Sequence, residues 1–248
     1  MKPGHPDTHV AFPGGGLTVT DHAFHDHNAA TELQRRGDRN IYLGAALMGT
    51  MILSIAGLPT FLHGLRQLTN AERRGLPVRP RTVTVTASLI MVASLTSMWQ
   101  TSLDLFANHA LMTRVSAMGY GLLFDGAYAW HYNGLAIGGA AGITEKPYQV
   151  LCLFVLYPAL MASAVGLMKM TRWGYQNSII FAFGNIFAIV GYTVNLSIYH
   201  DMRLSATEFG VPGWWIYNSV RLVVPLVVLA LLFTLDKETF TTRPRPCA

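Results

Sequence analysis

The stretch VTVTASLIMVASLTSMWQTSLDLFAN, residues Val83–Asn108, decides the fold class of this chain. It is apolar over most of its length and contains a single charged residue, Asp104, close to its end. A helix of about 20 apolar residues is long enough to cross the roughly 30 Å hydrocarbon core of a bilayer. The stretch therefore predicts a transmembrane helix that carries one acid near one membrane surface.

Four further stretches have the same character, and they cover residues 41–62, 148–168, 175–199 and 214–235. The whole chain has 248 residues, of which 51% are hydrophobic and only 12% are charged, whereas about a quarter of the residues in soluble domains are charged. We therefore predict an all-α integral membrane protein, built as a bundle of five transmembrane helices.

Residues 114–142 leave the number of spans open. This segment is apolar on average but is interrupted by Asp125, His131 and many glycines, so it is either a sixth span or a re-entrant or surface segment. Five spans with the N-terminus outside place more of the loop Lys and Arg residues on the cytoplasmic side than six spans do, which the positive-inside rule favours. We therefore predict a multi-pass protein of the plasma membrane whose N-terminal arm lies outside.

The predicted organisation has three parts. Residues 1–40 form a polar, His-rich N-terminal arm, residues 41–236 form the bundle, and residues 237–248 form a short cytoplasmic tail. The net charge of +5 does not indicate nucleic acid as a partner, because the basic residues lie mostly in short loops beside apolar stretches. The expected partners are instead the lipid bilayer, other membrane subunits and a small or lipophilic substrate.

Two of the predicted helices end in a similar polar pattern. Asp104 precedes His109 by five residues, and Asn195 precedes His200 by the same distance. With five spans the two helices run in the same direction, so both patterns lie at the outer surface, together with His131. Imidazole and carboxylate groups are ligands for copper or iron, although a spacing of five points the two side chains of one helix apart. The alternative is interfacial histidines beside a polar contact between helices.

The N-terminal arm contains a second metal-like pattern, DHAFHDHN, at residues 21–28. His22, His25 and His27 lie close together there, and short His-rich tracts bind metals. Because the arm is polar throughout, these histidines are expected to be exposed and to bind a metal only weakly. The alternative is a solvated helix that begins near Thr20 or Asp21 and has no ligand.

Two acids and one base inside apolar stretches are further candidates. Asp104 and Asp125 are candidate general acids, because a carboxyl group in apolar surroundings stays protonated and can donate its proton. Arg221 lies near the start of the last predicted span, at a depth similar to that of Asp104, so the two are expected to form an ion pair. A role for Arg221 in binding an anionic substrate is the alternative.

These residues support three functional hypotheses. The first is a subunit of a copper- or iron-dependent membrane oxidoreductase or monooxygenase, with His109, His200 and His131 as metal ligands. A haem is less favoured, since only His109 and His200 lie at one depth and both are near the interface. The second is a metal-free membrane cyclase or isomerase of isoprenoids, in which Asp104 or Asp125 protonates the substrate. The third is a non-catalytic subunit that contacts a larger complex through its small residues.

Overall fold

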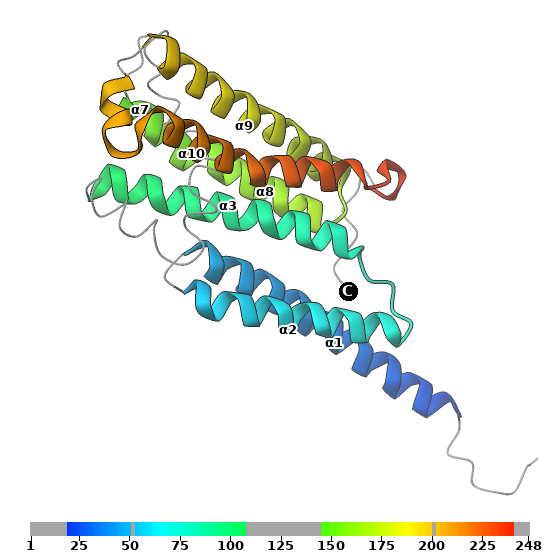
Figure 1. Cartoon of the computed structure of the whole chain (residues 1–248). Helices are drawn as coiled ribbons and strands as arrows, with labels where there is room; N and C mark the ends of the chain where they lie inside the picture. Colours follow the sequence, from blue (N-terminus) through cyan, green and yellow to red (C-terminus); the bar gives the residue numbers. More distant parts are fainter. Residues whose placement is uncertain (1–18, 51–52, 108–144, 200–201, 241–248) are drawn as a thin grey trace, which may run out of the picture.

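The computed structural model describes residues 19–50, 53–107, 145–199 and 202–240 (Figure 1). These residues are helical almost throughout, and no strand occurs among them, which confirms the predicted all-α class. The elements in chain order are α1 (Val19–Gly49), α2 (Ser54–Arg73), α3 (Arg81–Phe106), α7 (Glu145–Leu151), the π-helical turn η3 (Cys152–Leu156), α8 (Tyr157–Met168), α9 (Arg172–Tyr199), α10 (Met202–Phe233) and the 3₁₀ turn η4 (Lys237–Thr239).

The predicted single span over residues 41–62 is wrong, because the chain reverses direction inside it. Helices α1 and α2 lie side by side as an antiparallel hairpin (Figure 1). Gly44 faces Phe61 and Gly57 faces Met48 so closely that a Cβ atom on either glycine would meet the backbone of the other helix. Glycine lets the two helices touch at these positions. We call this unit, residues 19–73, the α1–α2 hairpin.

The other four predicted spans are helices, at α3, at α7–η3–α8, at α9 and at α10. Among the described residues, Arg81–Leu103 and Gln149–Met168 are long and apolar enough to cross a bilayer, and Ser219–Phe233 is apolar but shorter. Length and composition therefore support two membrane-spanning helices, and the predicted bundle of five is not confirmed. Helix α1 also continues through residue 40, where the arm was expected to end.

Helices α3, α8, α9 and α10 form a ring in which each contacts the next, and α10 contacts α3 again. The order of colours in Figure 1 shows that α3 and α9 run in one direction and that α8 and α10 run in the other. Ser94 of α3 donates a hydrogen bond to the Tyr157 carbonyl of α8 at 3.0 Å. Helices α3 and α9 are therefore parallel and lie across the diagonal of the ring. The α1–α2 hairpin packs on the outside of this ring, mainly through α1 against α3.

The bundle buries many small polar residues beside its apolar core, and it exposes large apolar residues on its surface. Helix α3 buries Thr84, Thr86, Ser88, Ser94, Thr96, Ser97, Gln100 and Thr101. Helix α9 exposes Ile180, Phe183, Phe187, Val190 and Val194, which follow one another at spacings of three and four residues and so form one helix face. Phe187 is 82% exposed. Soluble monomeric proteins rarely expose an apolar face of this length, so this exposed face suits contact with lipid.

Most Lys and Arg residues of the described helices lie at one end of the bundle, where α3 and α9 begin and where α2, α8 and α10 end, whereas Lys146 and Arg203 lie at the other end. We call this the basic end, because its described Lys and Arg residues are Arg35, Arg36, Arg39, Arg66, Arg73, Arg74, Arg79, Arg81, Lys169, Arg172 and Lys237. The opposite end, where α3 and α9 terminate and α7 and α10 start, is called the far end. Helix α1 begins on the side of the basic end and projects beyond the other helices (Figure 1).

Candidate functional site

Four large polar side chains are buried inside the bundle, from its middle toward the far end. They are Gln100 of α3, Gln149 of α7, Asn185 of α9 and Arg221 of α10, with exposures of 0%, 1%, 1% and 6%. Each of the four interacts with other groups of the protein. We call them the buried polar cluster, since every helix of the ring contributes one member if α7 and α8 are counted together.

The positions of Gln100 and Gln149 along the bundle follow from the contact between Ser94 and Tyr157. Gln100 lies six residues beyond Ser94, and Gln149 lies eight residues before Tyr157, which is the same direction because α3 and α8 are antiparallel. At 1.5 Å per residue the two amides are about 9 Å and about 12 Å from that contact, a difference of less than one helical turn. The two amides therefore lie at nearly the same level on neighbouring helices.

Arg221 is the charged member of the buried polar cluster, so its burial says most about the chemistry of the cluster. Its guanidinium is always charged and offers five N–H donors, and it lies in a helix whose neighbours Val220 and Val223 are exposed and apolar. Burying such a charge is costly unless it is paired, so an arginine at this depth indicates either a structural ion pair or an anion-binding role. Together with the three buried amides, Arg221 gives the interior of the bundle polar groups that can hold a polar or anionic group.

The backbones of Asp104 and Asn195, the two residues that precede the predicted histidine ligands, lie at the far end. Asp104 is about 15 Å beyond the level of Tyr157, counting ten residues from Ser94. Asn195 is about 18 Å beyond the same level, counting along α8 and α9 from the close contact between Gly166 and Gly174. The two backbone positions therefore differ by about 3 Å along the bundle, within one helical turn. Their side chains lie outside the described part, so the predicted Asp104–Arg221 pair stays a prediction.

The remaining predicted site residues fall on parts that the structure does not describe. His109, Asp125, His131 and His200 lie outside the described residues, and so do the side chains of His22, His25 and His27, whose backbones belong to α1. Within the described ranges, no three His, Cys, Asp or Glu side chains come together in a group that suits a metal. The metal and acid sites therefore remain predictions.

Sequence reasoning missed the three amides of the buried polar cluster. Gln100 lies four residues before Asp104 in the stretch that was singled out, and Gln149 and Asn185 each interrupt an apolar run. An amide inside a predicted span is the signal that could have identified them, because polar side chains within a bilayer face the interior of the bundle.

Comparison with known proteins adds no family to this description. No protein-family model, no curated protein and no solved structure matches the chain.

Proposed function

We propose that the chain is a membrane-embedded subunit of a copper- or iron-dependent oxidoreductase whose site lies at the far end of the bundle. The observation that supports this is the parallel course of α3 and α9, whose Asp104 and Asn195 backbones lie within one turn of each other along the bundle. His109 and His200 follow these two residues by five positions each. The shared level of Asp104 and Asn195 supports the proposal that the two patterns lie at one end of the protein.

In this proposal His109, His200 and His131 provide the imidazole ligands, and the carboxylate of Asp104 and the amide of Asn195 orient those rings or hold a bound water. The substrate is small or lipophilic and arrives from the bilayer, since the outer surface of α9 is apolar. The buried polar cluster lies on the inner side of this site, where its donors can hold the polar part of the substrate.

The test is the metal content of the purified protein. We would purify the chain from native membranes with its associated subunits and determine Cu, Fe and Zn per chain by elemental mass spectrometry. The double variant His109→Ala/His200→Ala is expected to lose a near-stoichiometric metal, whereas the control His63→Ala keeps it, because His63 is exposed on α2 toward the basic end. A wild-type protein without metal, or a double variant that retains it, would refute the proposal.

The second candidate is a metal-free cyclase or isomerase of isoprenoids, and the buried polar cluster is the observation that favours it. A bundle that buries a charged guanidinium and three amides suits the polar group of an otherwise apolar substrate, and Asp104 or Asp125 acts as general acid. The histidine variants then retain activity, and Asp104→Asn or Asp125→Asn abolishes it. A chain that has neither metal nor activity by itself is a non-catalytic subunit of a membrane complex.

A further inference from the structure

The α1–α2 hairpin is too short in its apolar part to cross a membrane. Its apolar segments, residues 41–49 and 53–62, are only about 14 and 15 Å long, which is half the roughly 30 Å of a hydrocarbon core. Both segments continue into charged sequence on the same side. The charged residues are Glu32, Arg35, Arg36, Asp38 and Arg39 on α1, and Arg66, Glu72 and Arg73 on α2, with Arg74 directly after it.

The tip of the hairpin ends part of the way along α3. The hydroxyl of Thr96 donates to the Gly49 carbonyl at 3.4 Å, and Gly49 lies directly against the side chain of Leu95. Thr96 is about 22 Å along α3 from Arg81 and about 12 Å short of Asp104, at 1.5 Å per residue. The tip therefore lies within the part of α3 that is apolar enough to cross a bilayer.

Backbone groups on both sides of the tip have partners inside the protein. The Thr50 hydroxyl donates to the Leu47 carbonyl at 2.8 Å and accepts from the Leu53 N–H at 3.3 Å. Together with the contact from Thr96, these bonds compensate for the interrupted helix. A turn at membrane depth requires such compensation, because lipid offers no hydrogen bonds to the backbone.

The exposed face of α2 changes from apolar to basic along its length. Ile55, Leu58 and Leu62 are exposed near the tip, at 86%, 37% and 46%. Arg66 and Arg73 continue the same face toward the basic end, at spacings of four and seven residues. An exposed helix face of this kind is suited to a bilayer, with the apolar part among acyl chains and the arginines among headgroups.

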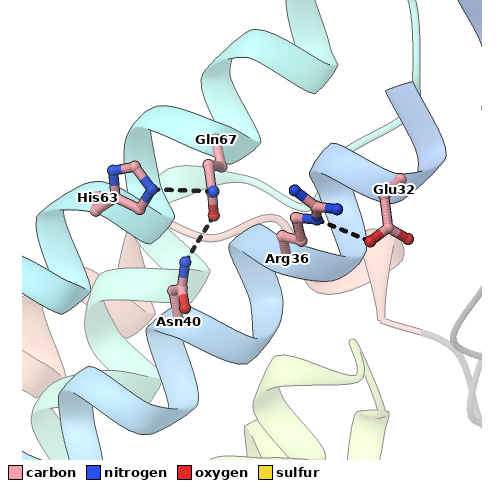
Figure 2. Close-up of polar contacts among 5 residues, drawn as sticks. All are labelled: Glu32, Arg36, Asn40, His63 and Gln67. Atoms are coloured by element: carbon pink, nitrogen blue, oxygen red, sulfur yellow. Dashed lines mark hydrogen bonds and ion pairs between the residues drawn. The ribbon is translucent and has the colours of Figure 1, made fainter. Parts of the chain in front are cut away.

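Polar contacts near Asn40 and Gln67 mark the level at which the exposed face of α2 changes from apolar to basic (Figure 2). The Asn40 amide of α1 donates to Gln67 of α2 at 2.8 Å, and the Gln67 amide lies 3.0 Å from His63. On the basic side of these contacts, Arg36 donates to Glu32 at 2.8 Å on the exposed surface of α1. Polar side chains thus begin on both helices at one level.

We propose that the α1–α2 hairpin is a re-entrant hairpin, which enters the bilayer from the basic end and returns to it, with Arg66 and Arg73 bound to anionic phospholipid headgroups. The basic end then faces the cytoplasm, since cytoplasmic loops carry the excess of Lys and Arg. Helix α1 consequently starts on the cytoplasmic side, which is opposite to the outside arm expected from the sequence. This proposal shares with the proposed function only the placement in a membrane.

The sidedness is tested with single cysteines in a Cys152→Ser/Cys247→Ser background. Ala29→Cys on α1, Asn70→Cys on α2 and Ala107→Cys after α3 are all exposed positions. A membrane-impermeant maleimide is expected to label Ala29→Cys and Asn70→Cys only in inside-out vesicles, and Ala107→Cys only in right-side-out vesicles. Labelling of Ala29→Cys and Asn70→Cys from opposite sides would overturn the hairpin and leave the metal site untouched.

The depth of the tip is tested with Ile55→Cys in the same background. This position is expected to react with a membrane-soluble maleimide and to resist the impermeant reagent in both vesicle orientations. Reaction with the impermeant reagent as fast as that of Asn70→Cys would show that the hairpin lies in water, which overturns the re-entrant placement. Metal loss in the histidine double variant is measured independently, so the two proposals fail separately.

The headgroup contact is tested with spin-labelled lipids on the protein reconstituted in phosphatidylcholine vesicles. We expect the wild-type protein to immobilise spin-labelled phosphatidylglycerol in preference to spin-labelled phosphatidylcholine. Arg66→Gln/Arg73→Gln is expected to reduce this preference by about fivefold for each arginine, and the charge-conserving Arg66→Lys/Arg73→Lys to retain it. An equal preference in the wild type and in the glutamine variant would overturn the assignment of these arginines.

Discussion

The close approach of α1 to α2 at Gly44 makes a quantitative prediction about stability. A Cβ atom on Gly44 would lie 2.5 Å from the Phe61 backbone nitrogen and 2.7 Å from its Cα, whereas ordinary contacts begin at 3.4 Å. Both atoms belong to the backbone of α2, so a side-chain rotation cannot relieve the clash. In Gly44→Ala the two helices must therefore separate by about 0.9 Å at this point, the difference between 3.4 Å and 2.5 Å.

The magnitude follows from comparison with a matched control, Gly191→Ala. Gly191 lies on α9 with no atom within 4 Å of the position that its Cβ would occupy. Both substitutions gain the same helix propensity, up to about 1 kcal/mol, so this contribution cancels between them. The remaining difference is the cost of overpacking, about 1–3 kcal/mol. We expect Gly44→Ala to melt roughly 2–12 °C below Gly191→Ala, at about 2–4 °C per kcal/mol for a chain of this size.

The assay is thermal unfolding of the two purified variants in the same detergent, followed by far-ultraviolet circular dichroism. Equal melting temperatures for Gly44→Ala and Gly191→Ala would refute the reasoning, because they would mean that α1 and α2 do not touch at Gly44. A Gly44→Ala variant that melts lower while Gly191→Ala melts at or above the wild-type temperature would agree with it.

Three further changes have expected outcomes. Arg79→Gln removes an ion pair of 2.7 Å to Asp38, in which the arginine side chain is only 12% exposed. We expect the free energy of unfolding, measured by melting, to fall by about 1–2 kcal/mol. Adding 1 M salt to the wild-type protein should not cause the same loss. Arg221→Leu leaves the partners of a buried guanidinium unpaired, so the free energy of unfolding is expected to fall by on the order of 3 kcal/mol. No such loss should occur if the guanidinium is exposed. The hydrogen bond from Arg36 lowers the pKa of the Glu32 carboxyl in the folded protein. The contribution of this ion pair to stability is therefore complete above the unfolded-state pKa of Glu32 and is lost as pH falls through its lower folded-state pKa. An NMR titration of the Glu32 carboxyl should show a higher pKa in Arg36→Gln than in the wild type.

The sequence was a sufficient guide to α3, α8 and α9, because each is a long apolar run whose ends are marked by charged or polar residues, whereas α10 begins at Met202, 12 residues before the predicted start. It was not sufficient for the α1–α2 hairpin. Residues 41–62 have the length and composition of one span, and the contact that compensates the turn comes from Thr96, 47 residues beyond Gly49. A pattern read along the chain does not show a hydrogen bond that depends on how helices are arranged in space.

The candidate site was predictable in a similarly partial way. The far-end location of Asp104 and Asn195 followed from the assumption that their helices are parallel, and α3 and α9 do run in the same direction. The buried amides Gln100 and Gln149 were not anticipated, and although an amide inside a span indicates an interior position, the sequence does not show which helix packs against it. In the structure α3 packs against both α7 and α8.

The hydrogen bond from Thr96 to the Gly49 carbonyl also has a consequence for biogenesis. In the proposed arrangement the tip of the hairpin depends on a residue that leaves the ribosome after it, so the hairpin has no stable place in the hydrocarbon until α3 has been inserted. Synthesis of a chain truncated before residue 81 is therefore expected to leave residues 41–62 at the membrane surface, where proteases can reach them. The full-length chain would acquire its protection only when α3 follows, so the order of insertion would differ from the order of translation.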